Sequence, residues 1–216
     1  MASLVLSIHS KNPELRKIEK VVEALHDGAV ILYPTDTGFT LGCELSNKEA
    51  INRIRAIRKI PDSKAMTFLC NSLSNIAEFA KVSNTAYKTI KALIPGPYTF
   101  ILPASKLVPK FAQDPKRNTA GIRVPENILS QLLLKENGAP IISISAKNDE
   151  VGPNSTPDDI VEIFSKHVDV AVRSDTYTFV GESSVINMTT DEFQIFRQGA
   201  GYEKLVNFLE EIEEEQ

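Results

Sequence analysis

The sequence contains no tryptophan, only two cysteines and three histidines, and its apolar runs are short. Cys43 and Cys70 have no neighbouring cysteine or paired histidine, which argues against a zinc site and a structural disulfide. A membrane-spanning helix takes roughly 20 apolar residues. The N-terminal apolar run is far shorter and has no basic leader of the kind a signal peptide carries. We therefore expect a cytoplasmic protein without a membrane segment or a metal site, in which both cysteines are buried.

The common motifs for phosphate binding and nucleophilic catalysis are also missing. There is no Walker loop, no dinucleotide glycine pattern and no Ser-His-Asp arrangement. The histidines His9, His26 and His167 are dispersed along the chain. Any phosphate binding must therefore be done by side chains.

The composition predicts one folded α/β domain over residues 1–216. Hydrophobic residues make up 42% and charged residues 24%, which is ordinary for a globular protein. Apolar runs of strand length alternate with stripes of helical spacing, which is typical of a sheet flanked by helices. Capping residues predict helix starts at four positions: Asn12, Ser46, Asn127 and Thr156. The last helix, residues 202–216, ends in an acidic run and is expected to carry no site.

The net charge of −4 hides a segregation along the chain. Residues 51–125 hold 13 Lys and Arg against 3 Asp and Glu, whereas residues 126–216 hold 6 against 18. A basic segment of this size is either a solvated charged face or the contact surface for an anionic partner. We favour the partner, with phosphate as the natural candidate.

Three polar features lie where predicted strands end or turn. Pro34 should close the strand 28–33 because it supplies no N–H, and Thr35, Asp36 and Thr37 then form either the rim of a small-molecule site or a self-bonded turn. Arg123 stands at the end of a strand before a proline, a usual place for a site residue. The run 140–146 puts Ser143 and Ser145 on one strand face, which is either a pocket wall or a plain sheet surface.

Seven motifs in one order carry a family resemblance. They are Pro34-Thr35-Asp36-Thr37, the basic helix end before Pro61, Pro95-Gly96-Pro97-Tyr98-Thr99, Arg123-Val124-Pro125, Ser143-Ile144-Ser145, Ser184-Val185-Ile186 and Arg197-Gln198-Gly199. In this order the chain resembles the YrdC-like family, the threonylcarbamoyl-AMP synthases and their relatives. The resemblance implies an open, twisted mixed sheet of about seven strands flanked by helices, with a concave basic face. Its best-known members join threonine, bicarbonate and ATP to make threonylcarbamoyl-AMP for tRNA modification.

Two departures place the chain nearest the YciO branch of that family. The enzyme group carries Lys-x-Arg before the proline and Ser-x-Asn on the later strand, both implied to hold ATP. Here these positions read Arg58-Lys59-Ile60 and Ser145-Ala146-Lys147. The forked donor is thus missing at Ile60, and a lysine replaces it only as a point charge. The YciO branch implies affinity for nucleotides and double-stranded RNA, with an unsettled reaction.

The resemblance also implies a set of site residues. Binding of threonine and of ATP or AMP is expected from Thr35, Thr37, Phe39, Arg58, Lys59, Lys64, Thr99, Arg123, Ser143, Ser145, Ser184 and Arg197. Arg123 would hold the threonine carboxylate, and Arg58, Lys59 and Lys64 the phosphates, so catalysis would be positional, without a nucleophile. Mg²⁺ would arrive with ATP rather than as a resident cofactor.

The basic segment predicts a second function. An interface for tRNA or double-stranded RNA is expected from Arg53, Arg55, Lys106, Lys110, Lys116 and Arg117. Two hypotheses therefore stand: a synthase-like nucleotide enzyme, and an RNA-binding module without that reaction.

Overall fold

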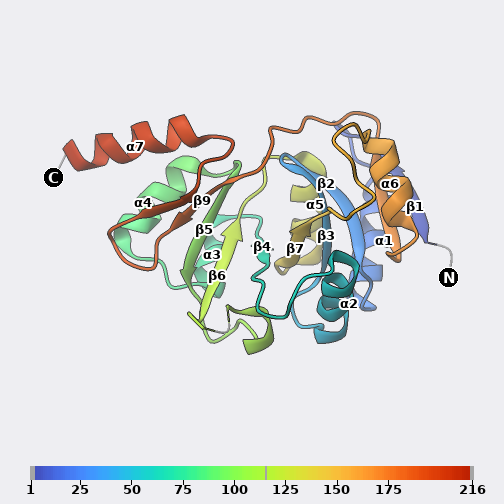
Figure 1. The fold of residues 1–216 in the computed structure, drawn as a ribbon, viewed down its shortest axis with the longest axis horizontal. Coiled ribbons are helices and arrows are strands. Elements are labelled where there is room, and N and C mark those ends of the chain that lie inside the picture. The colour runs from blue at the N-terminus through green and yellow to red at the C-terminus, as the bar shows by residue number, and fades with distance from the viewer. Residues whose placement is uncertain (1–2, 115, 215–216) are drawn as a thin grey trace.

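Ten strands join in one mixed sheet in the computed structural model, which describes residues 3–114 and 116–214 (Figure 1). The strands are β1 (Leu4–Ile8), β2 (Ile31–Thr35), β3 (Gly38–Glu44), β4 (Thr67–Leu69), β5 (Tyr98–Pro103), β6 (Thr119–Arg123), β7 (Ile141–Ser145), β8 (Val170–Ser174), β9 (Ser184–Asn187) and β10 (Gln194–Arg197). Their spatial order is β1-β8-β2-β3-β7-β4-β6-β5-β9-β10. The α/β fold with a mixed sheet is confirmed, but the expectation of about seven strands is wrong. The short strands β4 and β9 join the same sheet by pairing with the longer β6 and β5, and β10 then pairs with β9 at the edge.

The expected turn at Pro34 is instead a two-residue hairpin tip. β2 continues through Pro34 to Thr35, which pairs with Gly38 at the start of β3. Pro34 is tolerated because β2 pairs with β8 only at Ile31 and Leu32, so no bond to β8 is lost further along. Asp36 and Thr37 therefore form the loop itself.

Seven α-helices and one 3-10 turn complete the described chain. They are α1 (Leu15–His26), α2 (Lys48–Arg58), α3 (Leu73–Phe79), α4 (Asn84–Leu93), η1 (Lys110–Ala112), α5 (Ile128–Asn137), α6 (Pro157–Ser165) and α7 (Tyr202–Glu214). The predicted caps at Asn127 and Thr156 are confirmed, the second with a full capping box. Two predicted starts are wrong. The Asn12 N–H donates to the His9 ring, so α1 begins only after Glu14, and Asn47 rather than Ser46 caps α2.

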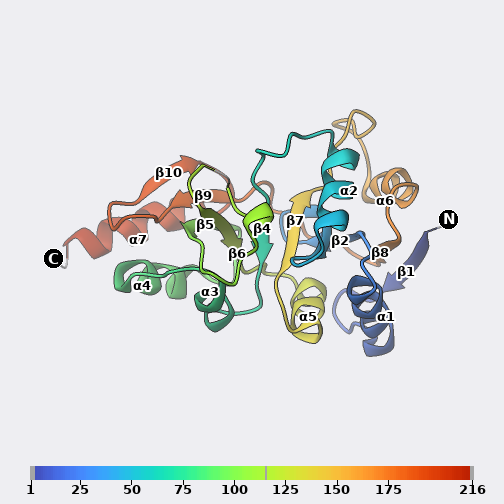
Figure 2. The same ribbon diagram turned by 90° about the horizontal axis from the view of Figure 1, so that it is seen from below.

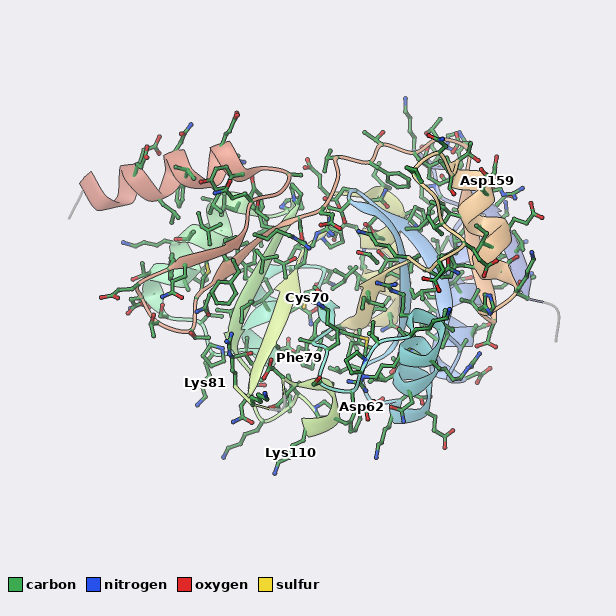
Figure 3. All side chains as sticks on the ribbon, viewed as in Figure 1. Asp62, Cys70, Phe79, Lys81, Lys110 and Asp159 are labelled. Carbon is green, nitrogen blue, oxygen red and sulfur yellow. The ribbon has the colours of Figure 1, made fainter. Side chains whose placement is uncertain are left out.

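Helices cover the sheet from both sides (Figure 2). Helices α1, α3, α4 and α5 lie along one side, and α2 and α6 lie on the other. One apolar core packs α1 and α5 on β2 and β8, and a larger one fills the rest of the molecule. Cys43 and Cys70 are both buried, as expected, and Cys70 lies well inside the molecule in Figure 3. Within the described residues, no helix is long and apolar enough to cross a membrane.

Candidate functional site

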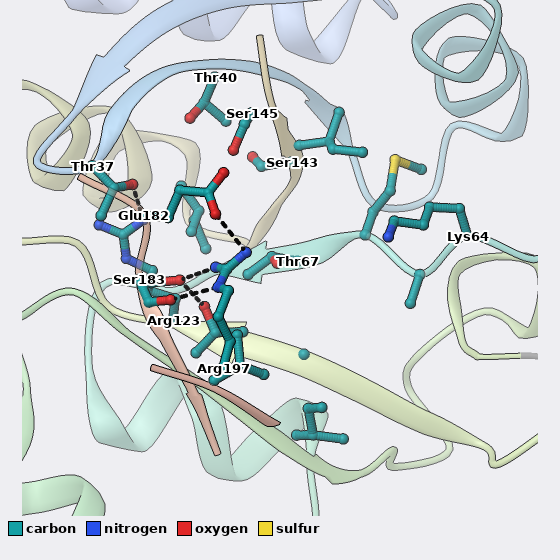
Figure 4. Close-up of a pocket in the computed structure, with 18 of the residues that line it drawn as sticks. Thr37, Thr40, Lys64, Thr67, Arg123, Ser143, Ser145, Glu182, Ser183 and Arg197 are labelled. Carbon is teal, nitrogen blue, oxygen red and sulfur yellow. Dashed lines mark hydrogen bonds and ion pairs between the residues drawn. The ribbon is translucent and has the colours of Figure 1, made fainter. Parts of the chain in front are cut away.

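A cavity of about 320 Å³ opens over the middle of the sheet, between the β2–β3 hairpin, β4, β5, β6, β7 and β10 (Figure 4). Much of its wall consists of hydroxyl groups, which come from Thr37, Thr40, Thr67, Thr99, Thr119, Ser143, Ser145 and Ser183. Its charged lining residues are Lys64, Arg117, Arg123, Arg197, Asp114 and Glu182. A wall of this kind offers many hydrogen bonds and an excess of positive charge, which suits a polar anionic ligand.

Strand pairing explains why the hydroxyls gather. Side chains two residues apart on a strand share a face, so Ser143 and Ser145 point the same way. Across the ladder, Thr67 pairs with Ser143 and Thr40 with Ser145. Both serines line the cavity, which decides the question left open by the sequence in favour of a pocket wall.

Arg123 is the most deeply buried cation of the site. Its guanidinium forms an ion pair with Asp36, and both side chains are less than one-tenth exposed. It also donates to the Thr37 hydroxyl and to the Gly96 carbonyl. Burial lowers the pKa of Arg123, and the Asp36 carboxylate opposes that shift, so the guanidinium stays charged. The hairpin tip thus fixes the guanidinium of Arg123, a residue that also lines the cavity.

Tyr33 holds one of the cavity-lining residues, Ser143, in place. Its hydroxyl lies 2.8 Å from the Ser143 hydroxyl. Complete burial raises the pKa of Tyr33 well above its ordinary value, so the phenol remains a neutral hydrogen-bonding group. The Ser143 hydroxyl is therefore oriented by a fixed partner rather than by water.

Charged and polar side chains link the opposite rim. The Glu182 carboxylate contacts Lys147 Nζ and lies 3.4 Å from Arg197 Nη1. The hydrogen bond from Lys147 lowers the pKa of Glu182. Arg197 also donates to the carbonyl and the hydroxyl of Ser183, and that hydroxyl shares a 2.8 Å bond with Thr99. Figure 4 shows Glu182, Ser183 and Arg197 meeting beside Arg123.

The cavity brings together part of the expected ligand set. The residues that line it are Thr37, Lys64, Thr99, Arg123, Ser143, Ser145 and Arg197. Five others lie outside its lining: Thr35, Phe39, Arg58, Lys59 and Ser184.

The five residues outside the lining make contacts within the protein. Thr35 donates to the Gly38 carbonyl at 2.9 Å, and Ser184 donates to the Ala200 carbonyl at 3.0 Å. Phe39 packs against two other aromatic rings. Arg58 donates to the Lys147 carbonyl, and Lys59 pairs with Asp149 at 2.6 Å.

The residues expected to meet RNA do not form one surface. Arg53 is held by two hydrogen bonds to Asp169, at 2.8 and 3.0 Å, and Arg55 is nearly buried and donates to the Phe111 carbonyl. In contrast, Lys106, Lys110 and Lys116 are exposed, and Lys110 points outward in Figure 3. Arg117 lines the cavity, with its guanidinium 5.9 Å from the centre of the Phe196 ring.

Several lining residues were not predicted from the sequence. They are Thr40, Thr67, Thr119, Asp114, Glu182 and Ser183. Thr40 and Thr67 can be recognised as site residues only when the pairing of their strands with β7 is known, because that pairing places them beside Ser145 and Ser143. Glu182 and Ser183 directly precede a recognised motif, but nothing local marks them as site residues.

The acids of the cavity are already engaged. Asp114 accepts the backbone N–H groups of Lys116 and Arg117, both at 2.9 Å, and Glu182 is paired with cations. Among residues 3–114 and 116–214, no group of three His, Cys, Asp or Glu side chains is placed to hold a metal ion. These acids are thus poorly suited to hold a resident Mg²⁺, whereas a cation brought by a nucleotide has its own phosphate ligands.

Comparisons with known proteins find relatives along most of the chain. The Sua5/YciO/YrdC family model, described as "Telomere recombination", matches residues 23–199. An uncharacterized protein of Haemophilus influenzae is 41% identical over 196 residues, covering 90% of this chain and 94% of that protein. A threonylcarbamoyl-AMP synthase of Vibrio campbellii is 28% identical, covering 86% of this chain and 100% of that protein.

Two solved structures have the same fold. The crystal structure of E. coli YciO has a TM-score of 0.86 at 37% identity and covers 94% of this chain and 98% of that chain. The P. abyssi Sua5 structure complexed with L-threonine has a TM-score of 0.84 at 23% identity, covering 94% of this chain and 61% of that one.

Proposed function

Because the chain belongs to the Sua5/YciO/YrdC family, we propose that its central cavity binds L-threonine beside an adenine nucleotide, as in an L-threonylcarbamoyladenylate synthase-like protein. The support from relatives is a synthase that matches most of this chain, and a Sua5 structure that contains L-threonine. In this proposal the product would serve tRNA threonylcarbamoyl-adenosine modification.

The observation that carries the proposal is the buried Arg123 in a wall of hydroxyls. A guanidinium has five N–H donors in a planar fork that matches a carboxylate. Arg123 uses part of this fork for Asp36, Thr37 and Gly96, and still lines the cavity. A threonine carboxylate at Arg123 would place the amine and hydroxyl of the ligand among the side-chain oxygens of Thr99 and Ser143.

The reaction needs alignment and charge neutralisation from the protein. Bicarbonate and the threonine amine give a carbamate and release water, and the carbamate oxygen then attacks the α-phosphorus of ATP while the bond to pyrophosphate breaks. Lys64 and Arg117 supply positive charge at the cavity wall, where phosphate would otherwise be repelled by Asp114 and Glu182. Mg²⁺ bound to the phosphates would add further neutralisation. No side-chain nucleophile is required.

The test is calorimetric titration of threonine and of ATP, followed by an assay for the AMP ester and pyrophosphate with threonine, bicarbonate and Mg-ATP. Thr99→Val should weaken threonine binding, because it removes a cavity hydroxyl and keeps the shape. Thr89→Val is the matched control, since Thr89 is buried in α4 and bonds the Thr85 carbonyl. Absence of threonine binding to the folded wild type would refute the proposal.

RNA binding is the second candidate function, and a different observation favours it. Lys106, Lys110 and Lys116 are exposed on the connection between β5 and β6. Arg117, at the cavity wall, belongs to the same connection. Double-stranded RNA is bound mainly through its backbone, which such a cluster of cations suits.

A further inference from the structure

The Glu182 side chain is unusual because its carboxylate lies between two cations at the edge of a cavity whose charged lining is mostly basic. Its two partners come from distant parts of the chain: Lys147 follows β7, and Arg197 ends β10. A carboxylate between a lysine and an arginine occupies the position that a phosphate oxygen takes when it binds such a pair.

The backbone around Glu182 is held firmly. Residues 175–183, here called the strap, connect β8 to β9 across the top of the sheet, in orange in Figure 1. In the strap, the Val180 N–H donates to the Asp36 carbonyl at 2.8 Å, and Tyr177 and Phe179 pack on Phe39. The middle of the strap is therefore anchored on the β2–β3 hairpin.

Close packing fixes the backbone at Glu182. Gly181 has a φ of +94°, a conformation that other residues adopt at a cost. The Glu182 carbonyl accepts the Ala200 N–H at 2.7 Å, and the chain at Gly199 passes so close that a methyl group there would overlap that carbonyl. These contacts fix the backbone at Glu182, and the ion pairs to Lys147 and Arg197 hold its half-exposed side chain.

We propose that the Glu182 carboxylate is a specificity determinant that holds the anion position between Lys147 and Arg197 and competes there with ligand phosphates. This proposal rests on the nucleotide site proposed above. Its consequence is that the cavity discriminates against ligands with long phosphate tails. A nucleoside, which places no phosphate at the rim, is unaffected.

The experiment compares wild type with Glu182→Gln, which keeps the size of the side chain and removes its charge. Titrations use inorganic pyrophosphate, ATP and adenosine at low and high salt. Affinity of Glu182→Gln for pyrophosphate and ATP should rise about five- to tenfold, which corresponds to removing one like charge at close range in a partly solvated site. The gain should shrink with salt, and adenosine binding should not change.

Two further variants sharpen the test. Lys147→Met in the Glu182→Gln background should abolish most of the gain, because the phosphate then lacks one of the two cations. Asp158→Asn is the control for overall charge, since Asp158, on α6, pairs with Arg173 of β8, and both residues lie outside the cavity lining. Thermal unfolding of each variant shows that the fold is kept. Should Glu182→Gln perturb the fold, Glu182→Ala is titrated in its place, with the same expected gain.

The outcomes separate this inference from the proposed function. Tighter pyrophosphate binding by Glu182→Gln without any adenosine or ATP binding supports the anion position and refutes the nucleotide site. If wild type binds ATP and threonine and Glu182→Gln binds ATP and pyrophosphate no more tightly, the inference is wrong while the proposed function stands. An equal gain in Asp158→Asn also overturns it, because net charge alone then explains the effect.

Discussion

At the scale of single residues, Arg123 combines a structural and a proposed binding role. Its ion pair with Asp36 is buried, and removing one partner of such a pair costs about 3–5 kcal/mol because the other charge is left uncompensated. One Asp36 carboxylate oxygen already lacks a hydrogen-bond partner within the described structure. A neutral replacement of Arg123 would therefore destabilise the fold, and its effect on ligand binding could not be separated from its effect on folding.

Arg123→Lys avoids that problem and gives the first prediction. The lysine keeps a positive charge near Asp36 but loses the planar fork. We expect threonine affinity to fall at least about tenfold, the value of a charge-assisted hydrogen bond, with a much smaller loss of stability than in Arg123→Met. Calorimetry and thermal unfolding measure the two effects. Arg16→Lys, at an exposed position of α1, is the control. Unchanged threonine affinity would exclude Arg123 as the carboxylate site.

Asp169 links α2 to the loop before β8 and gives a pH prediction. Burial raises its pKa, but the hydrogen bonds from Arg53 and from the Val30 N–H outweigh this, so the pKa of Asp169 lies below its usual value. A depressed pKa means that its stabilisation is complete above the unfolded-state pKa of about 3.9 and is lost as pH falls through the folded value.

Asp169→Asn should therefore flatten the dependence of unfolding free energy on pH below about pH 4. Because the pair is nearly half exposed, the loss at neutral pH should stay below about 1 kcal/mol. Urea unfolding at several pH values measures both. Arg53→Met should flatten the dependence of unfolding free energy on pH in the same range. If both variants keep the wild-type pH dependence, the Arg53–Asp169 pair is not its source.

At the scale of elements, the junction between the strap and β10 controls the shape of the cavity rim. Gly199 lies against the backbone of Glu182 and Ser183, which cannot move aside as a side chain can. Ser183 in turn bonds Thr99 and Arg197 in the cavity wall.

Gly199→Ala should consequently destabilise the protein by about 1–3 kcal/mol, the usual cost of overpacking, and weaken ligand binding in the cavity. Gly152→Ala is the matched control, because nothing lies within 4 Å of a methyl group at that position. Chemical denaturation of both variants tests the difference. Equal stability of the two would show that the junction relaxes without cost.

At the scale of the whole molecule, folding cancels much of the charge segregation seen along the chain. Arg53 of the basic segment pairs with Asp169 of the acidic segment, and Lys59 pairs with Asp149. Arg123 is neutralised by Asp36. Four exposed cations, Lys106, Lys110, Lys116 and Arg117, lie together on the connection between β5 and β6, which moves the proposed RNA surface away from the arginines of α2.

Replacing Lys106, Lys110 and Lys116 together with Gln should therefore weaken double-stranded RNA binding. The slope of log affinity against log salt should fall by about one unit for each phosphate contact removed. The control replaces three exposed lysines elsewhere, at positions 20, 135 and 204. Filter binding over a salt series provides the measurement. RNA affinity that is equal in the two triple variants would leave the lysine cluster as a solvated face.

The sequence alone determined the features that depend on neighbours within a few residues or on a recognisable motif. The caps at Asn127 and Thr156, the alternation that puts Ser143 and Ser145 on one face, and the family resemblance all belong to this class. Each depends on local hydrogen bonding or on the two-residue period of a strand.

The tertiary structure decided which of these residues meet. Sheet pairing brings Thr67 opposite Ser143, and a strap from another part of the chain places Glu182 between Lys147 and Arg197. The tertiary structure also leaves Thr35 and Arg58 outside the cavity, although the motifs predicted that both would line it. These contacts join residues tens of positions apart, so no local rule of spacing or charge specifies them. They follow from the register of the complete sheet and from the path of the chain across it.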